Sequence, residues 1–268
     1  MTPAAVIPAL ILTLVAFGVS ILTFFAGFGL GTLLMPAFAV FLPVEVAVAA
    51  TAIVHGANNV FKVALLARHA HRGVIVAFGL PAIGAAILGA WLLSQLAGEQ
   101  PLAAWTVLGR TAVITPVKLV LGVLIVIFGL LELVPALRTL RAPPGWLPLG
   151  GLLAGFFGGL SGHQGALRAA FLSRLGLSPT EFVATQSVLG LLVDAARLLV
   201  YTVTFLTGAG AAGGSDIPWA LVVVATAGAL AGALVGRRLL PKVTLPRLQL
   251  FIGVLLLAVG TGLAAGVI

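Results

Sequence analysis

The residues best suited to chemistry lie in one short segment, where a Ser-Gly-His-Gln-Gly sequence at 161–165 precedes Arg168. The segment brings a hydroxyl, an imidazole, an amide and a guanidinium beside an expected helix start. Hydrogen-bond donors that converge with a cation suit a small oxyanion better than a cation or a sugar. A metal at His163 is not expected, because the sequence has no cysteine and no further clustered histidines and carboxylates. The expected anion-binding residues of this segment are Ser161, His163, Gln164, Gly165 and Arg168.

A polar face on the next expected helix carries a second group. At 100° per residue its members fall within about 80° of arc, and they are Gln186, Asp194, Arg197 and Tyr201. An arginine inside a membrane costs at least ~2.5–3.5 kcal/mol on insertion scales, so Arg197 needs a partner or a function. Asp194, three residues earlier, is the expected partner. The sequence leaves open whether the pair is purely structural, orients Arg197 toward a substrate, or couples transport to protons through Asp194, the single deep carboxylate expected.

An earlier helix repeats this arrangement. One face of this helix, about 100° of arc wide, carries a row of polar side chains. They are Thr51, His55, Asn58, Asn59 and Lys62. We expect His55, Asn58 and Asn59 to bind substrate. The alternative is a hydrogen-bonded seam between helices, since Asn and Thr stabilise helix contacts in membranes by about 1 kcal/mol each. For Lys62 the alternative is a side chain that extends to the cytoplasmic headgroups.

Each polar helix follows a glycine cluster, at 27–31 and at 158–165. Irregular backbone at membrane depth is tolerated only against protein or a wet cavity, so the clusters are candidate cavity walls. Half-helices that begin after Gly31 and around Gly165 would present free N–H groups and a positive dipole end to an anion. We therefore expect Gly29, Gly31 and Thr32 to bind substrate as well. The alternative is that the glycines allow close helix packing.

The composition places these elements in a membrane. Of 268 residues 61% are hydrophobic and only 7% are charged, and the mean hydropathy of +1.26 excludes a water-soluble globule. Apolar stretches, most of them near the ~20 residues that cross a bilayer as helix, cover 4–42, 44–67, 74–96, 116–137, 147–173, 180–206, 218–236 and 248–267. The basic residues behind the net charge of +8 lie mainly in short loops. This placement indicates that they orient the helices in membrane lipid, and we expect no binding of nucleic acid.

The sequence contains two similar copies. A Phe-Phe pair precedes each glycine cluster and a Pro-x-Glu sequence opens each polar helix, as in transporters built from two structural repeats. Short basic loops stay in the cytoplasm, and these loops hold Arg68, Arg72, Arg138, Arg141, Arg237, Arg238, Lys242 and Arg247. With these loops on one side the copies face opposite ways, so 4–42 and 147–175 must each enter and leave on one face as a hairpin.

We therefore predict an all-α polytopic membrane protein with two inverted repeats, each a glycine-tipped helical hairpin plus three transmembrane helices. The first repeat covers 1–137, a cytoplasmic linker 138–146, and the second repeat 147–268, within one integrated transmembrane domain. Both termini are expected outside. The segment 97–115 is expected as an external loop with Trp105 at the interface.

These features resemble the TauE/SafE family of sulfite and organosulfonate exporters. The resemblance lies in the Gly-x-Gly-x-Gly sequence followed by Pro36, and in Gly-His-Gln-Gly-Ala-Leu-Arg at 162–168 with Asp194, Arg197 and Tyr201 after it. It runs over nearly the whole chain, and His163-Gln164 resembles a subgroup. It implies a multi-pass carrier of the bacterial inner membrane that moves sulfite, or a C2 sulfonate such as sulfoacetate, outward without a cofactor.

The predicted mechanism is alternating access, in which one repeat rocks against the other around an anion held between the hairpin tips. The alternatives are a passive anion channel, an importer of a related oxyanion, an intramembrane hydrolase and a structural scaffold. An enzyme is not expected, because no histidine follows His163 to act as a base for Ser161. The sequence leaves open the coupling ion and whether the chain forms homo-oligomers.

Overall fold

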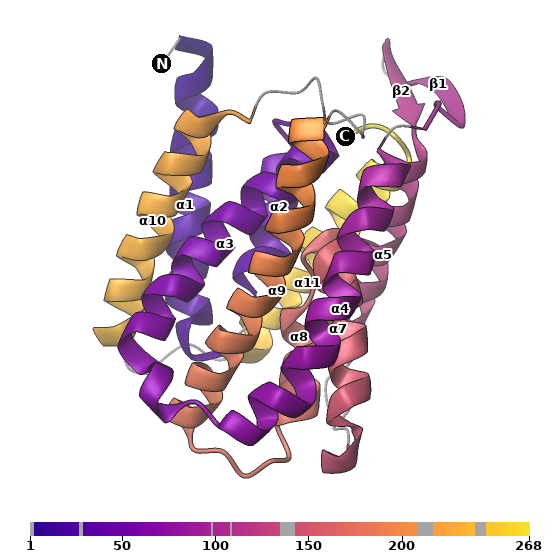
Figure 1. Cartoon of the computed structure of the whole chain (residues 1–268). Coiled ribbons are helices and arrows are strands. Elements are labelled where there is room, and N and C mark those ends of the chain that lie inside the picture. The colour runs from indigo at the N-terminus through magenta and orange to yellow at the C-terminus, as the bar shows by residue number, and fades with distance from the viewer. Residues whose placement is uncertain are drawn as a thin grey trace.

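A computed structural model of the chain describes residues 3–26, 29–97, 99–107, 109–134, 143–207, 217–238 and 245–268. These residues form a bundle of helices (Figure 1). The first half contains α1 (Pro3–Ala26), α2 (Leu30–Ala39), α3 (Val44–Leu66), the 3-10 turn η1 (Ala67–His69), α4 (Arg72–Leu96) and α5 (Pro116–Leu133). The second half contains η2 (Pro144–Trp146), α7 (Leu147–Ser161), α8 (Gly165–Leu172), α9 (Pro179–Thr207), α10 (Trp219–Arg238) and α11 (Leu245–Ala264).

The described helices confirm a mostly helical, polytopic membrane protein. Five of them are long and apolar enough to cross a membrane, namely α3, α4, α5, α9 and α10. Some of the predicted features lie outside the described residues. These are residues 138–142 of the linker, which include Arg138 and Arg141, Gly27 of the first glycine cluster, and Lys242 of the last basic loop.

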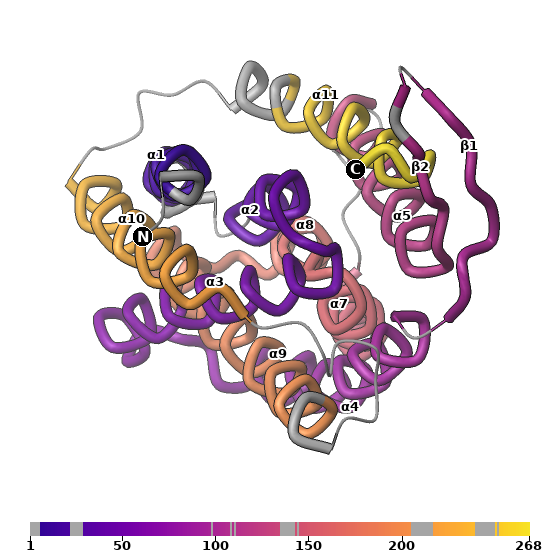
Figure 2. The backbone as a smooth tube through the Cα atoms, turned by 90° about the horizontal axis from the view of Figure 1, so that it is seen from above, coloured from indigo at the N-terminus to yellow at the C-terminus, as the bar shows by residue number. Residues whose placement is uncertain are grey.

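Each half begins with a helical hairpin that has one longer and one shorter arm, α1 with α2 and α7 with α8. Gly29 precedes α2 with a φ of 113°, and Gly162 follows α7 with a φ of 83°. Both angles lie in the left-handed region, which glycine adopts without strain. These two glycines therefore allow the chain to turn inside the bundle. Figure 2 shows that the short arms α2 and α8 both lie in its interior.

The hairpin turns are shorter than the predicted glycine clusters. In the second hairpin, Gly158 and Gly159 belong to α7, and the turn consists of residues 162–164 alone. In the first hairpin α2 begins at Leu30, so Gly31 lies inside the half-helix and not ahead of it. The prediction was wrong here because a glycine can serve in close helix packing as well as in a turn.

Packing partners are exchanged between the two halves. The first helix of the first half, α1, packs against α10, and the first helix of the second half, α7, packs against α4. The third helices of the two halves, α3 and α9, contact each other, as do the last helices, α5 and α11. Each long helix is therefore held mainly by a helix of the other half, and the halves do not form separate units.

Small residues bring the helices of these pairs into backbone contact. A Cβ on Gly155 of α7 would lie 2.2 Å from the carbonyl oxygen of Ala82 on α4, and one on Gly159 would lie 2.1 Å from that of Ala86. On α10, a Cβ on Gly232 would lie 2.2 Å from the carbonyl oxygen of Phe17 on α1. Such close approach stabilises helix pairs in lipid, where packing and not the hydrophobic effect drives association.

The polar helices begin where the Pro-x-Glu sequences predict. Pro43 precedes α3, and Pro179 is the first residue of α9. At α9 the backbone N–H of Ser178 donates to Glu181 Oε2 at 2.9 Å and the N–H of Glu181 donates to Ser178 Oγ at 3.3 Å. This capping box satisfies free N–H groups at the helix start. The two helices continue past their polar stretches, to Leu66 and Thr207.

The segment 97–115 is not the plain loop that the sequence suggested. It contains an antiparallel hairpin of β1 (Ala103–Val107) and β2 (Arg110–Ile114), so the fold is not strictly all-α. The strands are rich in β-branched and aromatic residues, which favour extended backbone. Trp105 is 44% exposed, and its Nε1–H donates to the carbonyl oxygen of Ala265 at 2.9 Å. This bond holds the β-hairpin beside α11 (Figure 2).

The two ends of the bundle differ. The N-terminal end of α1, the C-terminus and the β-hairpin lie at one end (Figure 1). The turn with Arg68 and Arg72 lies at the opposite end, as does the end of α10 with Arg237 and Arg238. The connection between α8 and α9, which contains Arg174 in the sequence, also lies at this end.

Candidate functional site

A group of buried polar side chains lies where the two halves meet. This central cluster consists of His55, Asn59, Gln164, Arg168, Gln186, Asp194 and Arg197. Each member is at most 7% exposed. The residues come from α3, from α8 and the turn before it, and from α9. Polar and charged groups at membrane depth need partners, so their hydrogen bonds show what the site is built to hold.

Asp194 is the centre of the hydrogen-bond network. Its Oδ1 accepts from Arg197, with Nε at 3.1 Å and Nη2 at 2.8 Å, and from Gln164 Nε2 at 3.1 Å. Its Oδ2 lies 2.6 Å from His55 Nδ1 and accepts from Asn59 Nδ2 at 3.0 Å. One buried carboxylate thus joins α3, α9 and the turn between α7 and α8.

Arg197 and Tyr201 also bond to the last turns of α7. Arg197 Nη1 donates to the carbonyl oxygen of Gly158 at 3.3 Å, and the Tyr201 hydroxyl donates to that of Gly159 at 2.6 Å. The charge of Arg197 is therefore compensated by Asp194, and the proton of Tyr201 is bound by backbone. Both side chains, which the sequence predicted as substrate ligands, fix α7 against α9.

Arg168 on α8 is surrounded differently. It is 1% exposed, and among the described residues it forms no ion pair. Its Nε donates to Gln186 Oε1 at 2.7 Å and its Nη1 donates to Gln164 Oε1. Because arginine can only donate, both amides must turn their oxygen toward it. The neighbours of Arg168 thus accept hydrogen bonds but supply no negative charge.

Gly190 on α9 makes room for this guanidinium. A Cβ at Gly190 would lie 2.7 Å from Asn59 Nδ2 and 3.1 Å from Arg168 Nη1. Sequence reasoning missed this residue, because it lies in no glycine cluster and only the packing of α3 and α8 on α9 shows what it faces.

The hairpin tips meet beside the central cluster. A Cβ on Gly31 would lie 3.2 Å from the carbonyl oxygen of Gly162 and 3.7 Å from His55 Cδ2. A Cβ on Gly162 would lie 2.9 Å from Arg197 Nη1. The start of α2, where Thr32 is 8% exposed, thus lies against the turn that leads to Gly165 at the start of α8. The residues predicted in the two glycine-rich stretches are brought together.

Several buried polar atoms near this meeting point have no partner in the part of the chain that the structure describes. They are Thr51 Oγ1, Asn58 Nδ2, His163 Nε2 and Gln186 Nε2. The oxygen of the Asn58 amide accepts from Ser20 Oγ at 3.4 Å, which leaves its NH₂ group without a bond. A buried polar group without a partner costs about 1–3 kcal/mol, so unsatisfied groups need an explanation. A polar ligand would supply one.

Two further charged side chains are buried in the bundle. Glu132, the second-last residue of α5, is 7% exposed, so Asp194 is not the only buried carboxylate. Lys62 is 5% exposed, so its side chain is enclosed by protein, which argues against the alternative that it extends to the headgroups. Both residues lie near the ends of apolar helices, where hydropathy does not distinguish a side chain that points outward from one that points inward.

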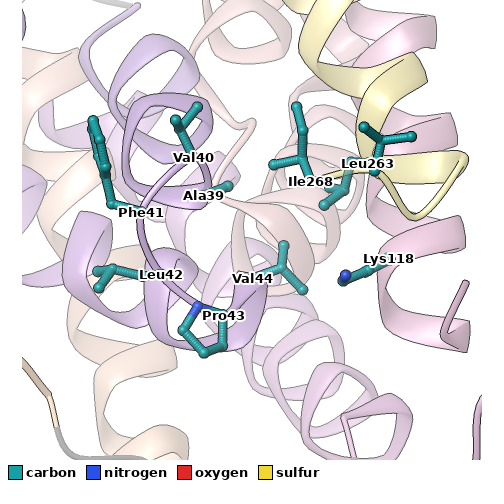
Figure 3. A pocket seen from close by; sticks show the side chains of 10 residues that line it. Ala39, Val40, Phe41, Leu42, Pro43, Val44, Lys118, Leu263 and Ile268 are labelled. Atoms are coloured by element: carbon teal, nitrogen blue, oxygen red, sulfur yellow. The ribbon is translucent and has the colours of Figure 1, made fainter. Parts of the chain in front are cut away.

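A separate pocket opens at the end of the bundle that holds the termini. It has a volume of about 330 Å³. Segment 39–44 forms one wall, and Lys118 and the C-terminal residues Leu263, Val267 and Ile268 form the other (Figure 3). No member of the central cluster lines this pocket.

Comparison with known proteins gives one match. The model of the family described as sulfite exporter TauE/SafE matches residues 12–263. No curated protein and no solved structure matches the chain.

Proposed function

Because the chain belongs to the sulfite exporter TauE/SafE family, we propose that it exports a small sulfur-containing anion, either sulfite or a C2 sulfonate such as sulfoacetate. The membrane is the bacterial inner membrane. The anion binds between the two hairpin tips, with Arg168 as the cation and with amide and backbone N–H groups as further donors.

The observation that carries this proposal is that Arg168 is buried and forms no ion pair with the described residues. A buried guanidinium without a carboxylate is unfavourable, and its neighbours Gln164 and Gln186 are neutral. Gln186 Nε2 is an unpartnered donor on the same amide that accepts from Arg168. A bound anion would compensate the charge and accept from this donor. The starts of α2 and α8 add free N–H groups near the same place.

Transport by alternating access is supported by the way the halves are arranged. Corresponding helices run in opposite directions in Figure 1, and the halves exchange packing partners. Two inverted repeats, at 1–137 and 147–268 around a cytoplasmic linker at 138–146, would move against each other about a site at their meeting point. Outward movement of an anion from an inside-negative cell gains ~2.3 kcal/mol per charge per 100 mV, so export needs no coupling ion.

The test is binding of sulfite to purified protein and to variants of Arg168. Charge-assisted hydrogen bonds contribute roughly 1.5–3 kcal/mol, so we expect Arg168→Ala to weaken binding by about ten- to a hundred-fold. Arg168→Lys retains the charge but not the planar fork, and its affinity is expected to be intermediate. The matched control is Arg174→Ala, because Arg174 is exposed just beyond α8.

Calorimetry in detergent measures affinity, and counterflow in proteoliposomes measures transport. Saturable counterflow is expected for a carrier and not for a passive channel. If both Arg168 variants bind sulfite as the parent does, or if the parent binds no sulfur oxyanion, the site is assigned wrongly.

A further inference from the structure

The turn between α7 and α8 determines which nitrogen of His163 carries a proton. Nδ1 lies 3.2 Å from both the carbonyl oxygen and the hydroxyl oxygen of Ser161. The carbonyl oxygen can only accept. The hydroxyl donates its proton to the carbonyl oxygen of Phe157 at 3.0 Å, so its oxygen also acts as an acceptor toward His163. Nδ1 must therefore be the donor.

The other nitrogen of the neutral ring, Nε2, is then a hydrogen-bond acceptor. It is buried without a partner among the described residues, and His163 is only 2% exposed. The ring stacks on Phe128 of α5, with centroids 5.2 Å apart and planes at 14°. Stacking covers a face of the ring and fixes the direction of its edge. Phe128 is thus a positioning residue that sequence reasoning missed.

The surroundings favour the neutral ring. No carboxylate bonds to His163 in the described part of the chain, and the adjacent Gly162 lies against the guanidinium of Arg197. A second cation at this position would be repelled by the first. His163 Nε2 is therefore an unpartnered acceptor among the described residues, and His163 directly precedes Gln164, whose side chain bonds to Arg168. All the other unpartnered groups of the site can donate.

We propose, on the basis of the anion site proposed above, that His163 Nε2 accepts a hydrogen bond from the transported anion itself. The site would then select anions that carry an O–H or N–H group besides their charged oxygens. Hydrogensulfite and hydroxy- or aminoalkanesulfonates belong to this class. Among the anions proposed above, the inference therefore favours sulfite in its protonated form, hydrogensulfite, over fully deprotonated sulfite and sulfoacetate, which have no hydrogen to donate.

The test compares two ligands of similar size and equal charge, isethionate and propanesulfonate, which differ by a hydroxyl in place of a methyl group. We expect the parent protein to prefer isethionate. For each protein we take the dissociation constant of propanesulfonate divided by that of isethionate. Dividing this ratio for the parent by the ratio for His163→Leu removes the difference in ligand hydration. A neutral hydrogen bond predicts that this quotient is roughly 2- to 12-fold. His163→Gln retains an acceptor oxygen and is expected to keep part of the preference.

His69→Leu is the control, because His69 lies in η1 at the basic end of the bundle, and it is expected to leave the ratio unchanged. If His163→Leu does not fold, nitrogen NMR of histidine-labelled parent protein reads the tautomer directly. An Nε2–H tautomer in the free protein would overturn the inference. So would equal ratios in parent and His163→Leu with both ligands still bound, and in that case the anion site itself would stand. Failure to bind either sulfonate or sulfite would overturn the proposed function and this inference together.

Discussion

At the scale of single residues, the central cluster holds two guanidinium groups and one carboxylate. Asp194 accepts from Arg197 and not from Arg168, so the two arginines have different surroundings. Arg197 is part of a network that ties α9 to α7, whereas the bonds of Arg168 within the described residues are to neutral amides. This difference is the reason why we propose a structural role for Arg197 and a substrate-binding role for Arg168.

Removing Asp194 is expected to destabilise the protein. Asp194→Ala would leave Arg197 buried without a counter-ion, which typically costs ~3–5 kcal/mol. Removing both charges, as in Asp194→Ala with Arg197→Met, leaves no stranded charge and is expected to cost less than the sum of the single changes. Thermal unfolding in detergent measures the stability of Asp194→Ala, of Arg197→Met and of the double variant. Additive losses would show that the two residues do not act as a pair.

The sequence predicted part of this network. Residues three apart share a helix face, so the spacing indicated the contact between Asp194 and Arg197. The same carboxylate also bonds to His55 and Asn59, which are 139 and 135 positions away. Those contacts depend on how α3 and α9 are rotated against each other. A polar face shows which residues point inward but not which of them meet.

At the scale of elements, glycines on α7 determine how close it lies to α4. Gly155→Ala would place a Cβ 2.2 Å from a backbone carbonyl oxygen, which cannot move without separating the helices. Overpacking of this kind typically costs about 1–3 kcal/mol, so we expect a lower unfolding temperature. Gly84→Ala on α4 is the matched control. Beyond the neighbouring backbone of α4 itself, no described atom lies within 4 Å of the Cβ position of Gly84. Helix propensity favours Ala over Gly there by up to ~1 kcal/mol. Equal unfolding temperatures for the two variants would contradict the close packing.

The glycine clusters show why composition predicts that a hairpin is present but not which of its glycines form the turn. Both clusters coincide with a change of chain direction, which is the feature that the sequence predicted. Within the second cluster, however, Gly158 and Gly159 pack and Gly162 turns. A glycine carries no side chain that could indicate which of these roles it has, so only the contacts distinguish them.

At the scale of the whole molecule, the placement of the basic turns predicts the topology. The sequence contains no cysteine, so single cysteines introduced at exposed positions report on one site each. Ala67→Cys in η1 and Ser173→Cys after α8 are expected to face the cytoplasm, since short basic loops stay inside. Ala104→Cys in β1 is expected to face outward. An impermeant thiol reagent applied to intact cells should label only Ala104→Cys, and label on one of the other two would rule out the inverted hairpin arrangement.

The contact between His55 and Asp194 also has a consequence for how the protein is made. The two residues are 139 positions apart. At about 5–20 residues per second of synthesis, Asp194 is therefore made roughly 7–28 s after His55. During that time the polar face of α3 lies in the membrane without the carboxylate that will bond to it. The 18-residue window of α3 has a mean hydropathy of only 1.2, against 2.3 for α5. The first half of the chain is thus inserted as an incomplete unit, and the ribosome must finish α9 before the site exists.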